Sequence, residues 1–342
     1  MTKVDCRGAA GPEFDLREFP THTFDRHCDR LPSAMIQTDL NSTPLNIVLN
    51  GLMRRYRERV PDVDGVVRAM IAEGLVKSVD DIENDHIAFR TMGVPHLGIA
   101  SFEKIFLHYG YQKRDFLRFD GKKLDAYWYS PPTAKEPRIF ISELCVDELS
   151  SDAQRIIRSY TDAVTSDPVD SLNLDDGAAV DEFLHSPLWR TPTWEDYQQL
   201  ADESEYAAWV IYNRYYLNHF TVSVHNLPPG YGTVEEFNKF LKSHGFRLNN
   251  SGGEIKVSPD GMLLQSSTVA EMVEATFPRA AGGETVESIA GSYVEFAERR
   301  VLPEFSALNP SEIRREHRRD GFEAANADRI FESTFRDQTG RR

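Results

Sequence analysis

The 342-residue chain has an ordinary globular composition, with 40% hydrophobic and 27% charged residues, which is enough apolar material for a sizeable core. Its formal net charge of −15 would repel a phosphate backbone, so we expect no nucleic-acid partner. The sequence has no apolar run long enough to cross a bilayer, no secretory signal pattern and only three cysteines. We therefore expect no membrane partner and a reduced, cytoplasmic setting, with an organelle as the open alternative.

The order of polar and apolar segments divides the chain into three parts. Residues 1–40 are polar and interrupted by prolines, and we interpret them as an N-terminal arm. Residues 41–305 are predicted to form a single domain, which consists of a helical part (41–80), a first module (81–145), a helical insertion (146–212) and a second module (213–305). Residues 306–342 are predicted to be a charged C-terminal tail containing a solvated helix.

The two modules repeat the order of a strand, a helix and further strands. The first strand of each begins at a polar residue followed by histidine, as Asp85-His86 and Asn218-His219, and the histidines lie 133 residues apart. We expect the helices around 101–109 and 233–244, and the later strands at 123–129, 138–144, 253–257, 262–267 and 292–297. The repeat predicts an α+β fold, in which two βαβββ modules form a barrel-like sheet with added helices. In the insertion, we expect three tryptophans to anchor the packing: Trp189, Trp194 and Trp209.

Strand periodicity places both histidines on polar faces. Side chains two residues apart share one face of a strand, so His86 lies with Arg90, and His219 lies with Thr221, while apolar residues occupy the opposite faces. A barrel-like sheet with a polar interior has this pattern. On these faces the two histidines could bind a metal ion. The alternative is that each is a hydrogen-bonded residue of the core without a ligand role. His225 is a further histidine near His219, for which we favour a role in a turn.

A third ligand would have to balance the charge of a metal held by two neutral imidazoles. Glu295 lies between the apolar residues Val294 and Phe296, so a strand would direct it inward together with Tyr293. A helix in the same place would favour Glu298 instead. Two histidines and one carboxylate leave coordination positions open, which is typical of non-haem Fe(II) centres that react with oxygen.

Three other residues could bind a substrate on the inward faces. Arg90 is suited to a carboxylate, because guanidinium donates two parallel hydrogen bonds, although a structural salt bridge would explain a buried arginine equally well. Gln265 and Ser267 alternate on one face of their strand and could orient an oxo acid or O₂. Their alternative is a polar core layer with internal hydrogen bonds.

Together, the motifs of residues 40–305 resemble the iron-dependent 2-oxoadipate dioxygenase/decarboxylases, relatives of the vicinal-oxygen-chelate fold. The matching segments are short, and the resemblance depends on their combination. They are NDHIAFRT (84–91), LDAYW (124–128), RIFISEL (138–144), NHFT (218–221), NNSGG (249–253), LQSSTVA (264–270) and GSYVEF (291–296).

This resemblance implies a function for the single domain, which would then be the catalytic domain. It implies that His86, His219 and Glu295 bind Fe(II), and that Arg90 binds the substrate, so we expect Arg90 to be a catalytic residue. Gln265, Ser267 and Tyr293 are predicted as further substrate contacts from their inward-facing positions. The implied reaction converts 2-oxoadipate and O₂ to D-2-hydroxyglutarate and CO₂, a step of lysine catabolism. The alternatives are a non-redox metal-dependent lyase or isomerase of the same fold, and a non-catalytic protein that binds a dicarboxylate.

Overall fold

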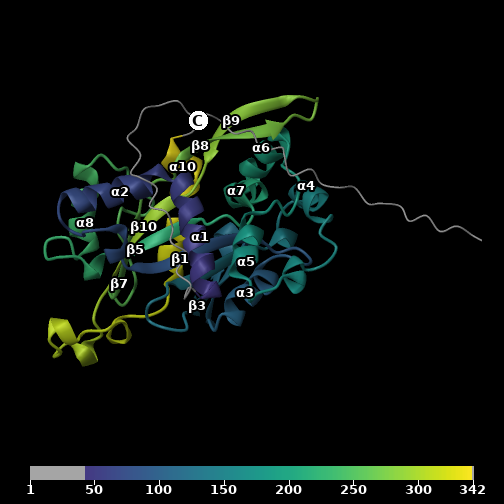
Figure 1. Ribbon diagram of the computed structural model, residues 1–342. Coiled ribbons are helices and arrows are strands. Elements are labelled where there is room, and N and C mark those ends of the chain that lie inside the picture. The colour runs from purple at the N-terminus through teal and green to yellow at the C-terminus, as the bar shows by residue number, and fades with distance from the viewer. Residues whose placement is uncertain (1–42, 341–342) are drawn as a thin grey trace, which may run out of the picture. The chain divides into compact units, whose positions relative to one another are not determined.

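The computed structural model describes residues 43–340, which belong to one compact unit (Figure 1). The predicted arm at residues 1–40 lies outside the described residues. The helical part that follows consists of α1 (Pro44–Arg59) and α2 (Pro61–Ala72). Thr43 caps α1, because its side chain accepts a hydrogen bond from the backbone N–H of Asn46 and a proline occupies the first turn. No helix in the part of the chain that the structure describes is both long and apolar enough to cross a membrane.

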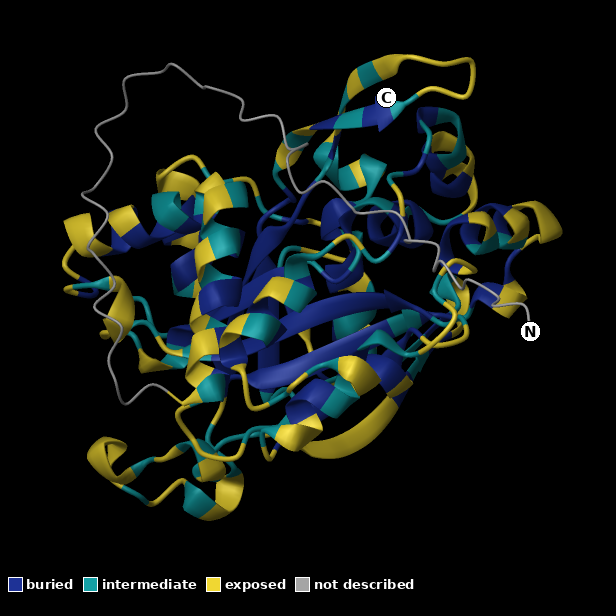
Figure 2. Cartoon of the chain, turned by 45° about the vertical axis from the view of Figure 1, so that its right-hand side comes forward, coloured by how far each residue is buried: buried dark blue, intermediate teal, exposed yellow. Residues whose placement is uncertain are grey.

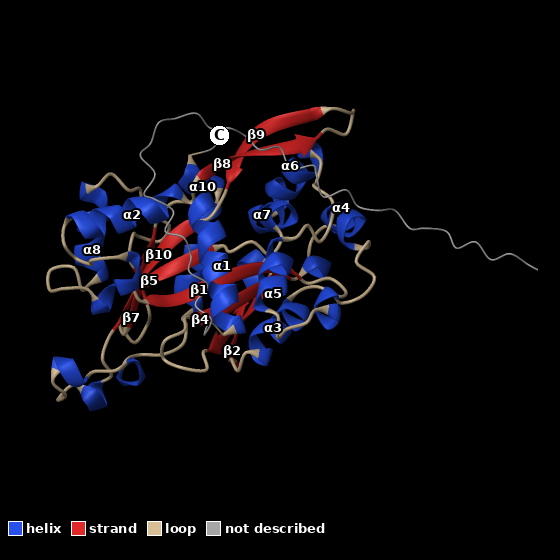
Figure 3. Ribbon diagram, viewed as in Figure 1, coloured by secondary structure: helices blue, strands red, loops and turns tan. Residues whose placement is uncertain are grey.

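The main sheet confirms the duplication. Its strand order is β2-β3-β4-β1-β5-β10-β7-β6 (Figure 3), and the first strands of the two modules, β1 and β5, are antiparallel neighbours at its centre. On either side of them the last strands of the modules, β4 and β10, pair in parallel. The two halves of this curled, half-barrel sheet are therefore equivalent. The bounds are β1 (Asn84–Met92), β2 (Gln112–Phe119), β3 (Leu124–Ser130), β4 (Arg138–Leu144), β5 (His219–Ser223), β6 (Lys256–Val257), β7 (Leu263–Ser267) and β10 (Tyr293–Arg299).

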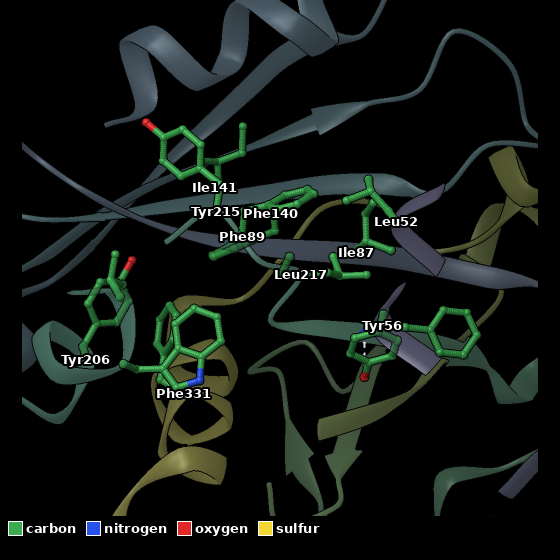
Figure 4. Close-up of a cluster of buried hydrophobic side chains, with 14 of the residues drawn as sticks. Leu52, Tyr56, Ile87, Phe89, Phe140, Ile141, Tyr206, Tyr215, Leu217 and Phe331 are labelled. Atoms are coloured by element: carbon green, nitrogen blue, oxygen red, sulfur yellow. Dashed lines mark hydrogen bonds between the residues drawn. The ribbon is translucent and has the colours of Figure 1, made fainter. Parts of the chain in front are cut away.

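Equivalent helices cover the outer face of the sheet. In the first module, α3 (Ile99–His108) packs through Phe102 on Phe89 of β1, with ring centroids 4.7 Å apart. In the second, α8 (Val234–Ser243) packs through Phe237 on Phe296 of β10, at 5.1 Å. Figure 2 shows the central strands of the sheet as buried, and Figure 4 shows part of the core, including Phe89. Burial of these outward-facing apolar side chains leaves the polar side chains of the same strands on the inner face.

The insertion is helical, as predicted. It contains α4 (Ser151–Thr161), α5 (Gly177–His185), α6 (Trp194–Glu203) and α7 (Glu205–Asn213). Trp189, Trp194 and Trp209 are all buried, which confirms their role as packing anchors. The indole N–H of Trp209 also donates to the backbone carbonyl of Gly291, at 2.7 Å, so α7 is attached to the loop before β10.

The strands of the structure differ from the predicted ones in three places. The strand expected at 253–257 is only the two residues of β6. β2 was not predicted, because its first five residues are exposed and give no apolar alternation. The second module also carries an additional two-stranded ribbon, formed by β8 (Met272–Pro278) and β9 (Glu284–Ala290) (Figure 3). The turn between these strands contains Gly282 and Gly283, both at positive φ.

The helix predicted in a solvated tail is instead packed against the sheet. Within the segment 319–335, which we call the C-terminal segment, α9 (Ala324–Phe331) has Asn326, Ile330 and Phe331 buried, and a short α10 (Arg336–Thr339) follows. The ring of Phe322 lies 5.0 Å from that of Phe140 in β4. The sequence does not predict this packing, because the segment has only four large apolar residues (Phe322, Ile330, Phe331 and Phe335) among many charged ones, which is too few to give a clear helical period.

Candidate metal centre

The three predicted ligands meet on the inner face of the sheet. The Nε2 atoms of His86 and His219 lie 3.3 Å apart. Glu295 Oε1 is 3.5 Å from His86 Nε2, and Glu295 Oε2 is 3.2 Å from His219 Nε2. All three side chains are buried, and among the described residues they form the one group of three or more His, Cys, Asp or Glu side chains close enough to hold a metal ion. Three strands, β1, β5 and β10, therefore each supply one candidate ligand.

The polar residue before each histidine fixes the direction of its ring. Asp85 Oδ1 lies 2.8 Å from His86 Nδ1, and Asn218 Oδ1 lies 3.1 Å from His219 Nδ1. The pairing of β1 with β5 is irregular between Asn84 and Ile87, which allows two consecutive side chains of β1 to approach each other. An oxygen at each Nδ1 accepts the ring proton there, so both Nε2 lone pairs point toward the carboxylate of Glu295.

This arrangement fits a cation. Two imidazole rings and a buried carboxylate converge on one point, which is electrostatically unfavourable unless a positive charge is bound there, either a metal ion or a proton on His86. Imidazole and carboxylate suit Fe, Zn, Mn or Ni, and three protein ligands leave positions open for other groups. Thr221 lies on the same face, with its Oγ1 3.1 Å from His86 Nε2.

The two histidines differ in their affinity for protons. Burial by itself lowers the pKa of His86, but the carboxylates of Glu295 and Asp85 outweigh it and raise the pKa above its usual value. Burial and the nearby charges of His86 and Arg90 hold the pKa of His219 well below its usual value. In the metal-free protein, a proton at this site is therefore carried by His86.

Asp85 is kept ionised by two buried arginines. Burial raises its pKa, but Arg299 and then Arg138 outweigh this effect and hold the pKa well below its usual range. Arg299 donates to both carboxylate oxygens, at 2.6 and 2.9 Å, and Arg138 donates to one of them at 3.2 Å. Arg299 also donates to the backbone carbonyl of Gly321 at 2.7 Å, so the same network holds the start of the C-terminal segment.

A small cavity lies beside the candidate ligands. One wall is polar and contains His86, His219, Glu295 and Gln265, while the facing wall is aromatic and aliphatic. Most of the apolar wall comes from the C-terminal segment, and the ring of Phe322 lies 4.8 Å from that of His86. The remaining lining residues are Phe140, Tyr293, Ala327, Ile330 and Phe331.

Arg90 is buried close to this cavity. Within residues 43–340 it makes no ion pair, so this part of the chain does not provide the structural salt bridge considered from the sequence. Its guanidinium donates to Thr334 Oγ1 and to the carbonyl of Phe331, both at 3.0 Å, and lies over the rings of Tyr206 and Trp209. Burial lowers its pKa, and its Nε has no hydrogen-bond partner. The buried guanidinium of Arg90, with no ion-pair partner among the described residues, is therefore suited to bind an anionic ligand.

The other predicted substrate contacts lie at different places. Gln265 and Tyr293 line the cavity, and the hydroxyl of Tyr293 is buried without a hydrogen-bond partner. Gln265 donates to Glu295 Oε1 at 2.6 Å. Ser267 does not line the cavity, because its hydroxyl pairs with that of Ser333 at 2.9 Å.

The alternatives considered for the ligands lie outside the cluster. Glu298 Oε2 accepts from the backbone N–H of Val234 at 3.0 Å and so caps α8. His225 accepts from the backbone N–H of Arg299 at 3.2 Å, in the short 3-10 turn that follows β5. Asp85 orients the ring of His86, and from the sequence it is recognised only as the polar neighbour of that histidine. Its position immediately before a candidate ligand is the signal that could have identified it.

Comparison with known proteins gives consistent matches over the described unit. The family model described as 2-oxoadipate dioxygenase/decarboxylase matches residues 48–309. The chain is 48% identical over 308 residues to the "2-oxoadipate dioxygenase/decarboxylase, chloroplastic" of Arabidopsis thaliana, which covers 86% of this chain and 78% of the relative. It is also similar to the crystal structure of the hydroxyglutarate synthase from Oryza sativa in complex with 2-oxoadipate, with a TM-score of 0.75, 44% identity, and coverage of 86% of this chain and 93% of the other.

A more distant structure matches the fold alone. The putative glyoxalase superfamily protein from Ralstonia eutropha JMP134 aligns with a TM-score of 0.64 at 22% identity, over 83% of this chain and 88% of that one. This match supports the α+β architecture expected from the repeat and the vicinal-oxygen-chelate-like fold that the family resemblance implies.

Proposed function

Since the chain belongs to the family of 2-oxoadipate dioxygenases/decarboxylases, we propose that it converts 2-oxoadipate and O₂ to D-2-hydroxyglutarate and CO₂, with Fe(II) held by His86, His219 and Glu295. The observation that supports this most directly is the buried cluster of two imidazoles and one carboxylate beside a cavity. The reaction balances without a second oxo acid, because the substrate itself loses the carboxylate and both atoms of O₂ enter the products.

The metal and the protein contribute different parts of this chemistry. When bound, Fe(II) supplies the electrons that activate O₂ and open positions for an oxo acid. Asp85 and Asn218 hold the two ring N–H groups, which directs the Nε2 atoms inward, toward the position that the metal would take. The apolar wall formed by Phe322, Ile330 and Phe331 excludes water from the reacting groups.

Arg90 and Tyr293 provide the two donors for a substrate carboxylate. Arg90 Nε and the Tyr293 hydroxyl are both buried without a partner, and Tyr293 is close enough to Arg90 to offset part of the lowering of the Arg90 pKa that burial causes. With the reacting oxo-acid end next to the ligands, we assign these donors to the distal carboxylate. The side chains that define the far end of the cavity would then select a dicarboxylate over a monocarboxylate.

Oxygen consumption tests the proposed function. Purified protein loaded with Fe(II) in air is expected to consume O₂ and release CO₂ with 2-oxoadipate, to form D-2-hydroxyglutarate, and to need no added 2-oxoglutarate. Product identified by chiral chromatography, with metal-free protein as the control, measures this directly. Turnover that proceeds equally without O₂ would instead support a non-redox lyase or isomerase.

Metal affinity is expected to fall as the pH is lowered. His86 must lose its proton to bind a metal, and its pKa in the metal-free protein is raised above the usual value of about 6.5. Below that pKa a single proton competes with the metal, so the dissociation constant should increase about tenfold per pH unit. Titration with Co(II) between pH 6 and 8 measures the slope, and a flat profile would contradict His86 as a ligand.

The cellular compartment stays a prediction. The cysteine content favours a cytoplasmic protein, while the relative from Arabidopsis thaliana carries a chloroplastic name. An organelle is thus the natural alternative to test by localising the full-length chain.

A further inference from the structure

The side chain of Gln265 connects Glu295 to α9. Its Nε2 donates to Glu295 Oε1 at 2.6 Å, and its Oε1 accepts from Asn326 Nδ2 at 3.0 Å. All three side chains are at most 2% exposed, so water does not compete for these contacts. A residue of the C-terminal segment thus acts on a candidate metal ligand through one intermediate side chain.

The orientation of the Gln265 carboxamide decides whether this connection is favourable. With its NH₂ group toward Glu295, it donates to the carboxylate. Turned by a half rotation, it would place its carbonyl oxygen against the carboxylate, and two buried acceptors would face each other. Both orientations of the Gln265 carboxamide fit the same space, because its oxygen and nitrogen ends are nearly the same size.

Asn326 is itself held in one orientation by the backbone. Its Nδ2 faces the carbonyl oxygens of Lys256 and Leu263, both at 3.3 Å, in addition to Gln265 Oε1. Backbone carbonyls only accept hydrogen bonds, so the nitrogen end of Asn326 has to point toward them. The direction of the hydrogen bonds is therefore set by β6 and β7 and passes through Asn326 to Gln265 and then to Glu295.

We propose that Asn326 is a positioning residue for Glu295. It fixes the carboxamide of Gln265 so that the NH₂ group holds Glu295 Oε1, which leaves Oε2, 3.2 Å from His219 Nε2, directed toward the ligand cluster. This inference rests on the proposed function through the metal-binding role of Glu295. Nothing in the family comparison assigns a role to this residue, which lies beyond the matched range of 48–309.

Binding of Co(II) to the full-length chain tests the proposal through a double-mutant cycle. Asn326→Leu removes the amide at nearly constant size and charge, and Gln265→Met removes the carboxamide. We expect each to weaken Co(II) binding about tenfold, within the range typical of residues that orient metal ligands, and to change the visible absorption spectrum of the Co(II) complex. Because Asn326 acts through Gln265, the double variant should bind Co(II) no more weakly than Gln265→Met alone.

Asn238→Leu is the matched control. Asn238 on α8 is 3% exposed and accepts from Ser266 Oγ at 2.7 Å, so it bonds to the neighbouring residue of β7 on the opposite face. Its loss should leave Co(II) affinity and spectrum unchanged. If circular dichroism shows that Asn326→Leu does not fold, Asn326→Ala replaces it in the same cycle.

Two results would overturn the proposal. One is an unchanged Co(II) affinity and spectrum in Asn326→Leu. The other is a loss that adds fully to that of Gln265→Met, which would mean that Asn326 acts on the fold and not through Gln265. A wild-type protein that binds no Co(II) would contradict the metal site itself, and is distinguishable from both.

Discussion

Glu295→Gln is expected to abolish metal binding at the site and, with it, oxygen consumption on 2-oxoadipate. The substitution keeps the size of the side chain but removes the one negative charge among the three candidate ligands. Outer residues that orient metal ligands typically change affinity by about 10- to 100-fold, and loss of a ligand charge should exceed that range. Iron content after loading, measured by elemental analysis, and the Co(II) dissociation constant both report the change.

The control for this prediction is Glu298→Gln, three residues further along β10. Glu298 caps α8 through the backbone N–H of Val234 and pairs with Arg300 at 2.9 Å, away from the cluster. It should retain full iron content with only a small loss of stability. Equal iron content in the two variants would remove Glu295 from the ligand set.

Arg90→Met is expected to raise the KM for 2-oxoadipate and to lower kcat/KM, while iron binding persists. Truncating one partner of a buried, hydrogen-bonded charge pair costs about 2–5 kcal/mol, equivalent to a roughly 30- to several thousand-fold loss in kcat/KM. Arg90→Lys should recover little of the loss, because an ammonium group cannot reproduce the planar set of donors that guanidinium offers. Steady-state oxygen uptake with both variants measures these effects.

A monocarboxylic substrate supplies the matched comparison. With 2-oxohexanoate, which lacks the distal carboxylate, wild type and Arg90→Met should differ little, whereas they should differ strongly with 2-oxoadipate. An equal loss on both substrates would show that Arg90 acts on the oxo-acid end or on the fold, contrary to the assignment made above.

The parts of the site that could be predicted from the sequence depend on local periodicity. His86 and His219 stand at the start of similar strands with a polar neighbour, and strand parity directs Glu295 inward. The strands predicted at 123–129, 138–144 and 262–267 also agree closely with β3, β4 and β7, which are short segments rich in apolar residues. A two-residue period is a property of neighbouring positions, so it needs no knowledge of the tertiary structure.

The parts that could not be predicted depend on pairs distant in sequence. The pairing of Asp85 with Arg299 joins residues 214 positions apart, and the contacts of Arg90 with Phe331 and Thr334 span more than 240. Nothing in either local sequence marks its partner. The C-terminal segment was also misjudged because its charged composition hides a narrow apolar side, which is evident only against the cavity that it covers.

The position of α9 in the chain affects when the site can form during protein synthesis. His86 emerges from the ribosome long before Glu295, and the side chains of Phe322, Ile330 and Phe331 that line the cavity follow Glu295. The first module can fold around an inner face that still lacks two candidate ligands and its apolar wall. A nascent chain that has not yet exposed β10 therefore offers no complete set of candidate ligands, so a metal held by all three can bind only after the second module has emerged.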